Sequence, residues 1–191
     1  IEPMGHASGY ITDLISFLQS TFQSFTNLPH LFPIDGKIAE KVAQTACMLA
    51  CKHIAQAMMD FLLDNDVKMI SSGALQQLNL DLLQCEQFSA SEPVPGINDG
   101  TLQMAFLDLR QLLNLFLEWD WSTYLADYGK DTSKYLRVNP ASCITLLEKL
   151  KDADKKKNNL LTSFKRNERD KKKLMDTVLK QLRQLANGHI H

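Results

Sequence analysis

The sequence predicts an all-α protein, built as an elongated, rod-like bundle of antiparallel helices. Apolar residues recur at three- and four-residue spacing over most of the 191 residues, which is typical of helices with one buried face. The 8 Gly and 6 Pro are too few for the many turns of a β-sandwich or barrel. No run of four to eight residues alternates convincingly as a strand. We therefore expect helices alone.

The first two helices are predicted over residues 8–25 and 35–63. Pro29 and Pro33 end the first, because proline cannot continue a helix. The second begins at Asp35, a good N-cap, and would be roughly 40–45 Å long at 1.5 Å per residue. Its main apolar stripe, which we expect to face the core, consists of Ile38, Val42, Ala46, Leu49, His53, Ala57 and Phe61. Neighbouring positions widen this stripe, namely Ala50, Ile54, Met58 and Leu62.

Two further helices are predicted over residues 67–88 and 101–125. In the first, a stripe of apolar residues is formed by Leu75, Leu78, Leu82 and Cys85. The loop over 89–100 follows, with two Pro and two Gly. The second helix has a broad leucine-rich face that ends in Trp119, Trp121 and Tyr124. We expect these aromatic rings to cap the hydrophobic core rather than to form a binding cage.

A loop over 128–138 precedes the last two helices. Asn139-Pro140 is a strong helix start, because the amide can cap and the proline suits the first helical position. This helix is predicted to end near Lys151, followed by a solvated break over 152–159. The final helix runs from about 167 to Asn187-Gly188. Its apolar residues face one way, namely Leu174, Val178, Leu182 and Leu185.

Charge divides the chain, although the formal net charge is only −1. Residues 1–145 carry 8 Lys/Arg against 16 Asp/Glu, whereas residues 146–191 carry 13 Lys/Arg against 6 Asp/Glu. Such asymmetry suggests two partners of opposite charge or two separately solvated elements. We assign 1–128 to a helical bundle and 129–191 to a basic C-terminal helical extension.

Motifs of catalysis and cofactor binding are missing from the sequence. There is no phosphate loop GxxxxGK[ST], no GxGxxG, no HExxH and no GxSxG. Cys47 and Cys51 lie four residues apart and could offer two thiolates to a metal, but zinc needs four ligands, or three and a water. Two small buried residues are the favoured interpretation. We expect no enzyme activity, no metal and no cofactor.

The basic tail has three interpretations. It could bind an anionic membrane surface, pair with acidic surfaces of this chain or a partner, or be a solvated helix face. The candidate contact residues for membrane or assembly are Lys155, Lys156, Lys157, Lys165, Arg166, Lys171 and Lys172. Nucleic acid is not expected as a partner, because no recognition fold accompanies the charge.

The segment 73–88 is unusual because it has a second surface of mixed polarity. Leu80 and Leu83 lie off the apolar stripe, between the amides Gln76, Asn79 and Gln84. Such a surface suits a protein partner, since amides satisfy hydrogen bonds at modest desolvation cost. A helix buried on two sides within a bundle explains the same pattern.

Several motifs carry a resemblance to a known family. They are EPVPG (92–96), LDLRQLL (107–113), WDWSTYLADYG (119–129), KYLRVNP (134–140), LLEKLKD (146–152) and KQLRQLANG (180–188). The chain resembles the C-terminal region of the exocyst complex component 6 family, the Rab-effector subunits of the vesicle-tethering exocyst.

The resemblance implies a rod of stacked helical bundles, as in other multisubunit tethers, and a non-enzymatic interaction protein. Its partners would be a GTP-loaded Rab GTPase and other exocyst subunits, with only peripheral membrane contact. It would act in exocytosis from the cytoplasm, on secretory or recycling vesicles and at plasma membrane sites. The mixed surface of 73–88 then becomes the candidate Rab-binding site, through Asn79, Gln76, Leu80 and Gln84.

Overall fold

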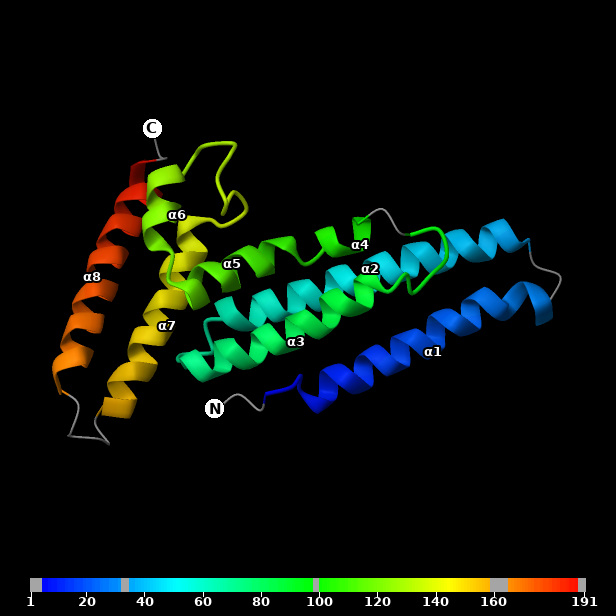
Figure 1. Ribbon diagram of the computed structural model, residues 1–191, viewed down its shortest axis with the longest axis horizontal. Coiled ribbons are helices and arrows are strands. Elements are labelled where there is room, and N and C mark those ends of the chain that lie inside the picture. The colour runs from blue at the N-terminus through cyan, green and yellow to red at the C-terminus, as the bar shows by residue number, and fades with distance from the viewer. Residues whose placement is uncertain (1–4, 32–34, 98–99, 159–164, 189–191) are drawn as a thin grey trace. The chain divides into compact units, whose positions relative to one another are not determined.

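The computed structural model describes residues 5–31, 35–97, 100–158 and 165–188, with only the backbone of 29, 31, 155–158 and 165–169 (Figure 1). These residues form helices and no strand, which confirms the predicted all-α fold. The helices are α1 (Gly9–Leu31), α2 (Gly36–Leu63), α3 (Ser72–Ala90), α4 (Thr101–Met104), α5 (Leu107–Glu118), α6 (Trp121–Asp127), α7 (Pro140–Asn158) and α8 (Lys165–Gly188).

Two compact units divide the chain. The N-terminal unit contains Glu2–Met58 and Gln76–Arg110, and the C-terminal unit contains Met59–Leu75 and Gln111–His191. The expected division into a helical bundle over 1–128, with the candidate Rab-binding surface, and a basic helical extension over 129–191 stays a prediction.

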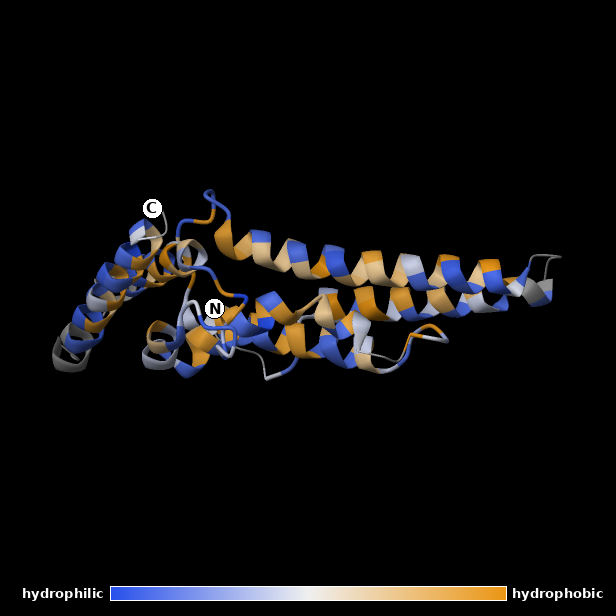
Figure 2. Ribbon diagram, turned by 90° about the horizontal axis from the view of Figure 1, so that it is seen from above, coloured by the Kyte–Doolittle hydropathy of each residue, from blue (hydrophilic) through white to orange (hydrophobic). Residues whose placement is uncertain are grey.

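The N-terminal unit has a core formed by one face each of α1, α2 and α3, and α1 and α2 run in opposite directions (Figure 1). The long helices carry hydrophilic and hydrophobic residues side by side along their length, as amphipathic helices do (Figure 2). From α1 and α3 the buried residues are Ile11, Ile15, Leu18, Phe22, Leu78, Leu82, Cys85 and Phe88. The predicted stripe of the third helix is therefore confirmed.

The register of α2 differs from the prediction. The stripe expected in the core is largely exposed: Ile38, Val42 and Leu49 are 59%, 49% and 60% exposed. The buried face carries Ala39, Ala43, Cys47 and Cys51, together with Ile54, Met58 and Leu62, which were correctly predicted to widen the core-facing stripe. The small side chains of Ala39, Ala43, Cys47 and Cys51 let neighbouring helices approach closely, so along this part of α2 the larger Ile38, Val42 and Leu49 point outward.

Among the described residues, α2 is long and apolar enough to cross a membrane, judged by length and composition alone. Within the N-terminal unit, however, its small-residue face is fully buried at Ala43, Cys47 and Cys51. Lys52 interrupts its outward face. We therefore treat α2 as a helix of the bundle.

The predicted helix over 101–125 is three helices, α4, α5 and α6. Trp119 has φ 57°, in the left-handed region that an α-helix cannot contain, and this residue ends α5. Its ring packs edge to face on Trp121, with centroids 5.7 Å apart, and Trp121 packs in the same way on Phe116 at 5.0 Å. Trp121 and Tyr124 are 4% and 1% exposed, so the aromatic residues of α6 belong to the core, as expected.

The helix starting at Pro140 is longer than predicted. Asn139 caps it as expected, because its Oδ1 accepts a hydrogen bond from the Ser142 N–H at 2.8 Å. Residues 152–158, predicted as a break, continue α7, while 159 lies outside the described residues. In the C-terminal unit α7 lies beside α8 (Figure 1), and the Asp154 carboxylate accepts from Lys171 of α8 at 2.7 Å. This pairing stabilises a segment that looked fully solvated in the sequence.

A buried lysine holds the end of α2 against α7 in the C-terminal unit. Lys149 is 7% exposed, and its Nζ donates to the carbonyl oxygens of Leu62 at 2.8 Å and Asp64 at 2.6 Å. These carbonyls belong to the C-terminal end of α2, where helix carbonyls lack intrahelical partners and attract cations. Desolvation by burial lowers the pKa of Lys149. The lysine therefore acts as a cap supplied by a distant part of the chain.

A candidate protein-binding surface on α3

The outward face of α3 carries the four predicted Rab-binding residues. Gln76 is exposed, and Asn79, Leu80 and Gln84 are half-buried. Their helical spacing places them on one side of α3, opposite the buried Leu82. One face of α3 is therefore core, and the other remains accessible. Whether it binds a Rab stays a prediction.

Leu83 also lies on this face, although it is not among the four predicted residues. Leu83 is 44% exposed and is the most exposed large apolar side chain of α3. Since helical residues three and four apart are neighbours, Leu83 lies between Asn79 and Leu80 on one side and Glu86 and Gln87 on the other. In the sequence, the position of Leu83 off the apolar stripe already indicated that this leucine is exposed.

A polar cluster of Asn79, Glu86 and Arg110 fixes one side of this face. Arg110 of α5 donates to both carboxylate oxygens of Glu86, from Nε at 2.8 Å and from Nη2 at 2.6 Å. A third bond runs from Arg110 Nη1 to Asn79 Oδ1 at 2.5 Å. The planar guanidinium fork makes such bidentate pairs rigid. Arg110 was missed because its partners lie 24 and 31 residues away in sequence.

A buried carboxylate, Asp81, links α3 to the start of α1. Asp81 is 2% exposed and accepts from the Ser8 N–H at 2.6 Å, the Ser8 hydroxyl at 2.9 Å, the Tyr10 hydroxyl at 3.0 Å and Gln77 Nε2 at 3.3 Å. Burial and the contact with Asp81 raise the pKa of Tyr10 to about 12. The cluster satisfies the carboxylate with hydrogen bonds, so its role is to hold α1 in place.

The cysteines of the N-terminal unit are buried thiols. Cys47 and Cys51 are fully buried and Cys85 is 1% exposed, and all three are free. The hydrogen bond with Cys47 and burial raise the pKa of Cys51, and burial raises the pKa of Cys85 to about 12. Among the described residues, no three His, Cys, Asp or Glu side chains gather as a metal site would require.

The basic tail is described only in part. The side chains of Lys155, Lys156, Lys157, Lys165 and Arg166 lie outside the described residues. Lys171 and Lys172 are exposed, and Lys171 pairs with Asp154 of α7. Arg183 of α8 likewise pairs with Glu148 of α7 at 2.7 Å, and Lys151 of α7 pairs with Asp176 of α8. Part of the basic charge therefore joins α7 to α8, and membrane contact stays a prediction.

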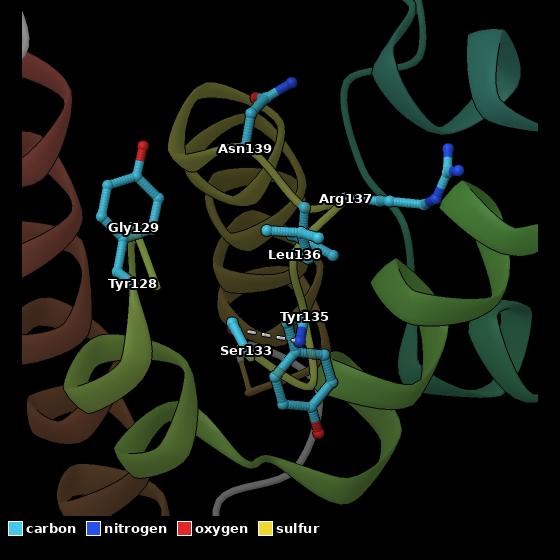
Figure 3. A pocket seen from close by; sticks show the side chains of 8 residues that line it. Tyr128, Gly129, Ser133, Tyr135, Leu136, Arg137 and Asn139 are labelled. Atoms are coloured by element: carbon cyan, nitrogen blue, oxygen red, sulfur yellow. Dashed lines mark hydrogen bonds between the residues drawn. The ribbon is translucent and has the colours of Figure 1, made fainter. Parts of the chain in front are cut away.

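A small cavity in the C-terminal unit is lined by the loop between α6 and α7. Its volume is about 220 Å³, and in Figure 3 Leu136 lies between Tyr128 and Arg137. Two of its polar side chains bind backbone N–H groups: Ser133 Oγ accepts from the Tyr135 N–H at 3.2 Å, and Asn139 caps α7. These two contacts hold the loop together.

Comparison with known proteins identifies the family. The model of the family "Exocyst complex subunit Sec15 C-terminal" matches residues 1–149. Exocyst complex component 6 from Homo sapiens is 60% identical over 98% of this chain, and its counterpart from Drosophila melanogaster is 50% identical over 98%.

The match covers only part of these relatives. The chain spans 22% of the human protein and 23% of the fly protein. The crystal structure of a Sec15 C-terminal domain is 46% identical over 60% of this chain and 33% of its own length, with a TM-score of 0.48. The family model and the two relatives agree, so the chain belongs to the Sec15 C-terminal family of exocyst complex subunits.

Proposed function

We propose that this chain is a non-enzymatic part of a vesicle-tethering exocyst subunit and that it binds a GTP-loaded Rab GTPase. Through this contact it links secretory or recycling vesicles to the exocyst during exocytosis. It acts from the cytoplasmic side, with other exocyst subunits as further partners and with peripheral membrane contact only.

The observation that carries the proposal is the outward face of α3. This face combines the half-buried Leu80, the exposed Leu83 and the exposed amide Gln76 on one rigid helix. Interfaces between proteins have such an anatomy, an apolar centre surrounded by polar groups that can form hydrogen bonds. An enzyme would instead need nucleophilic or acid–base side chains gathered in a cleft.

Selectivity for the GTP state comes from the Rab. The switch regions of a GTPase are ordered by the γ-phosphate and its Mg²⁺ and are released on hydrolysis. A helix face such as that of α3 can therefore discriminate the two states without touching the nucleotide. The chain itself carries no phosphate-binding motif.

The test is a binding measurement by calorimetry with a panel of Rab GTPases, each loaded with a non-hydrolysable GTP analogue or with GDP. We expect at least one Rab to bind in the GTP form and to bind at least about tenfold more weakly in the GDP form. Equal affinity for both forms, or no binding by any Rab, would overturn the proposal.

A further inference from the structure

We propose that the outward side of α8 is a membrane-contact surface, which binds anionic lipid headgroups through Lys172, Lys173 and Lys180. The helix contacts the bilayer by charge, while its apolar face stays inside the protein. This inference rests on the peripheral membrane contact of the proposed function and names its surface and its lipid class. It does not require Rab binding.

The apolar face of α8 is already used within the C-terminal unit. Helix α8 lies beside α7 (Figure 1), and its apolar residues Met175, Val178, Leu179 and Leu182 are buried there. An amphipathic helix that inserts into a bilayer needs this face free, because burial of apolar area in the lipid drives the insertion. With the unit folded, α8 therefore has only its polar side to offer to a membrane.

Ion pairs with α7 divide the basic residues of this polar side into two groups. Lys171 and Arg183 each pair with a carboxylate of α7 at 2.7 Å, so their charge is compensated within the protein. Lys172, Lys173 and Lys180 are exposed and have no ion-pair or hydrogen-bond partner among the described residues. These three unpaired lysines are the charge that the described part of α8 can offer to an anionic surface.

Two of the unpaired lysines point directly away from the core. A separation of two residues turns a helix by about 200°, which places Lys173 opposite the buried Met175 and Lys180 opposite the buried Leu182. Lys173 and Lys180 are seven residues apart, so they lie on one side of α8, about 10.5 Å apart along its axis. Lys172 precedes Lys173 and extends the charge toward one edge. A flat anionic surface can therefore contact all three.

The composition of this side fits a lipid surface better than a protein partner. Interfaces between proteins have an apolar centre and are depleted in lysine. Among the described side chains of α8, Leu174 is the one large apolar group that is exposed, and it lies about 100° around the helix from Lys173. A lysine is a hydrated point charge on a flexible stem, which suits the diffuse charge of phosphatidylserine or phosphoinositide headgroups.

The strength of the contact follows from the number of unpaired lysines. Each lysine near an anionic membrane surface strengthens binding by about fivefold, so three together supply about 100-fold. This attraction falls off within a Debye length, which is about 8 Å at physiological ionic strength. Binding should therefore depend on the anionic lipid and weaken steeply with salt.

The test is cosedimentation of the 191-residue chain with two kinds of vesicle. One kind is phosphatidylcholine with about 30% phosphatidylserine, and the other is phosphatidylcholine alone. We expect binding to the anionic vesicles in about 50 mM NaCl, at least about tenfold weaker binding in about 500 mM NaCl, and no binding to the neutral vesicles.

A triple substitution isolates the α8 surface. The variant Lys172→Gln, Lys173→Gln, Lys180→Gln removes three charges but keeps side chains of similar helix propensity, so circular dichroism should show unchanged helicity. Its binding to the anionic vesicles should be weaker than that of the wild type by at least about thirtyfold.

A matched control removes the same charge elsewhere. Lys37, Lys41 and Lys52 are exposed residues of α2, and their replacement by Gln changes the net charge equally. This variant should bind the anionic vesicles within about threefold of the wild type. If both triple variants lose binding equally, net charge drives the contact and the inference is wrong.

The remaining outcomes separate the lipid from other partners and this inference from the Rab contact. Equal binding to neutral vesicles would overturn the inference, because apolar insertion would then dominate. Binding to polyglutamate without binding to anionic vesicles would overturn it as well, since the partner of α8 would be an acidic protein. The vesicles carry no Rab, so a chain that binds a GTP-loaded Rab but no anionic vesicle refutes this inference and leaves the proposed Rab contact standing.

Discussion

Substitution of the buried Lys149 by methionine should destabilise the C-terminal unit markedly. The methionine has nearly the same length and fills the same space, so the change removes the charge and the hydrogen bonds with little loss of packing. The ammonium group donates to the carbonyls of Leu62 at 2.8 Å and Asp64 at 2.6 Å, at the end of α2. Both carbonyls would lose this partner.

The magnitude follows from these contacts. Two hydrogen bonds from a charged donor contribute about 1.5–3 kcal/mol each, and the favourable position at a helix C-terminus adds about 0.5 kcal/mol. Water reaches part of this helix end, because Asp64 is exposed, and the methionine regains stability by apolar burial. We expect a net loss of about 3 kcal/mol, which for a chain of this length lowers the melting temperature by roughly 6–12 °C.

The assay is urea unfolding followed by circular dichroism, with thermal melting as a second measurement. The control is Lys130→Met, which removes an exposed lysine whose pair with Asp127 at 2.7 Å should contribute only about 0.3–0.5 kcal/mol. If Lys149→Met costs no more than Lys130→Met, the cap does not stabilise the fold and the reasoning is wrong.

Three further predictions concern the remaining contacts. Asp81→Ala leaves the Ser8 and Tyr10 donors without their acceptor and should lower the free energy of unfolding by about 3 kcal/mol. In an amide hydrogen-exchange experiment on this variant, α1 should exchange first, and uniform exchange across the chain would contradict the prediction. The pKa of Tyr10 is raised to about 12, so the folded state favours the protonated phenol. The stabilisation of the fold by this protonated phenol is therefore complete below pH 10 and is lost between pH 10 and 12. Since Tyr10 is 63% exposed, this loss should stay below about 1 kcal/mol, and Tyr10→Phe should remove it from a pH series of urea unfolding curves. Arg183→Ala should cost less than about 1 kcal/mol because its pair with Glu148 is half-exposed, whereas Leu182→Ala, at a fully buried position, should cost about 2–5 kcal/mol by the same assay.

Helix boundaries show where local sequence was sufficient. The starts of α2 and α7 were predicted within a residue or two, since Asp35 and Asn139 are caps that act on backbone groups two or three residues ahead. The break at Trp119 was missed, because its left-handed backbone is stabilised by ring contacts with Trp121 and by the packing of the unit around them. A single residue forced out of the helical region leaves no pattern in the spacing of apolar residues.

The face of α2 shows where periodicity was insufficient. Both Ile38–Val42–Leu49 and Ala43–Cys47–Cys51 recur at helical spacing, and hydrophobicity alone favours the larger side chains for the core. The structure buries the small ones, because the distance between neighbouring helices sets the volume available at their contact. Periodicity identifies a helix with two apolar stripes, but only packing decides which one is buried.

The sequence by itself determined the helical class, the mixed polarity of α3 and the family resemblance, since composition, spacing and motifs are local properties of the chain. Only the tertiary structure decided which distant polar groups meet. Arg110 orients Asn79 from 31 residues away, Asp81 holds Ser8 from 73, and Lys149 caps Leu62 from 87. Hydrogen bonds act over about 3 Å, so which groups they join depends on the fold that brings distant residues together.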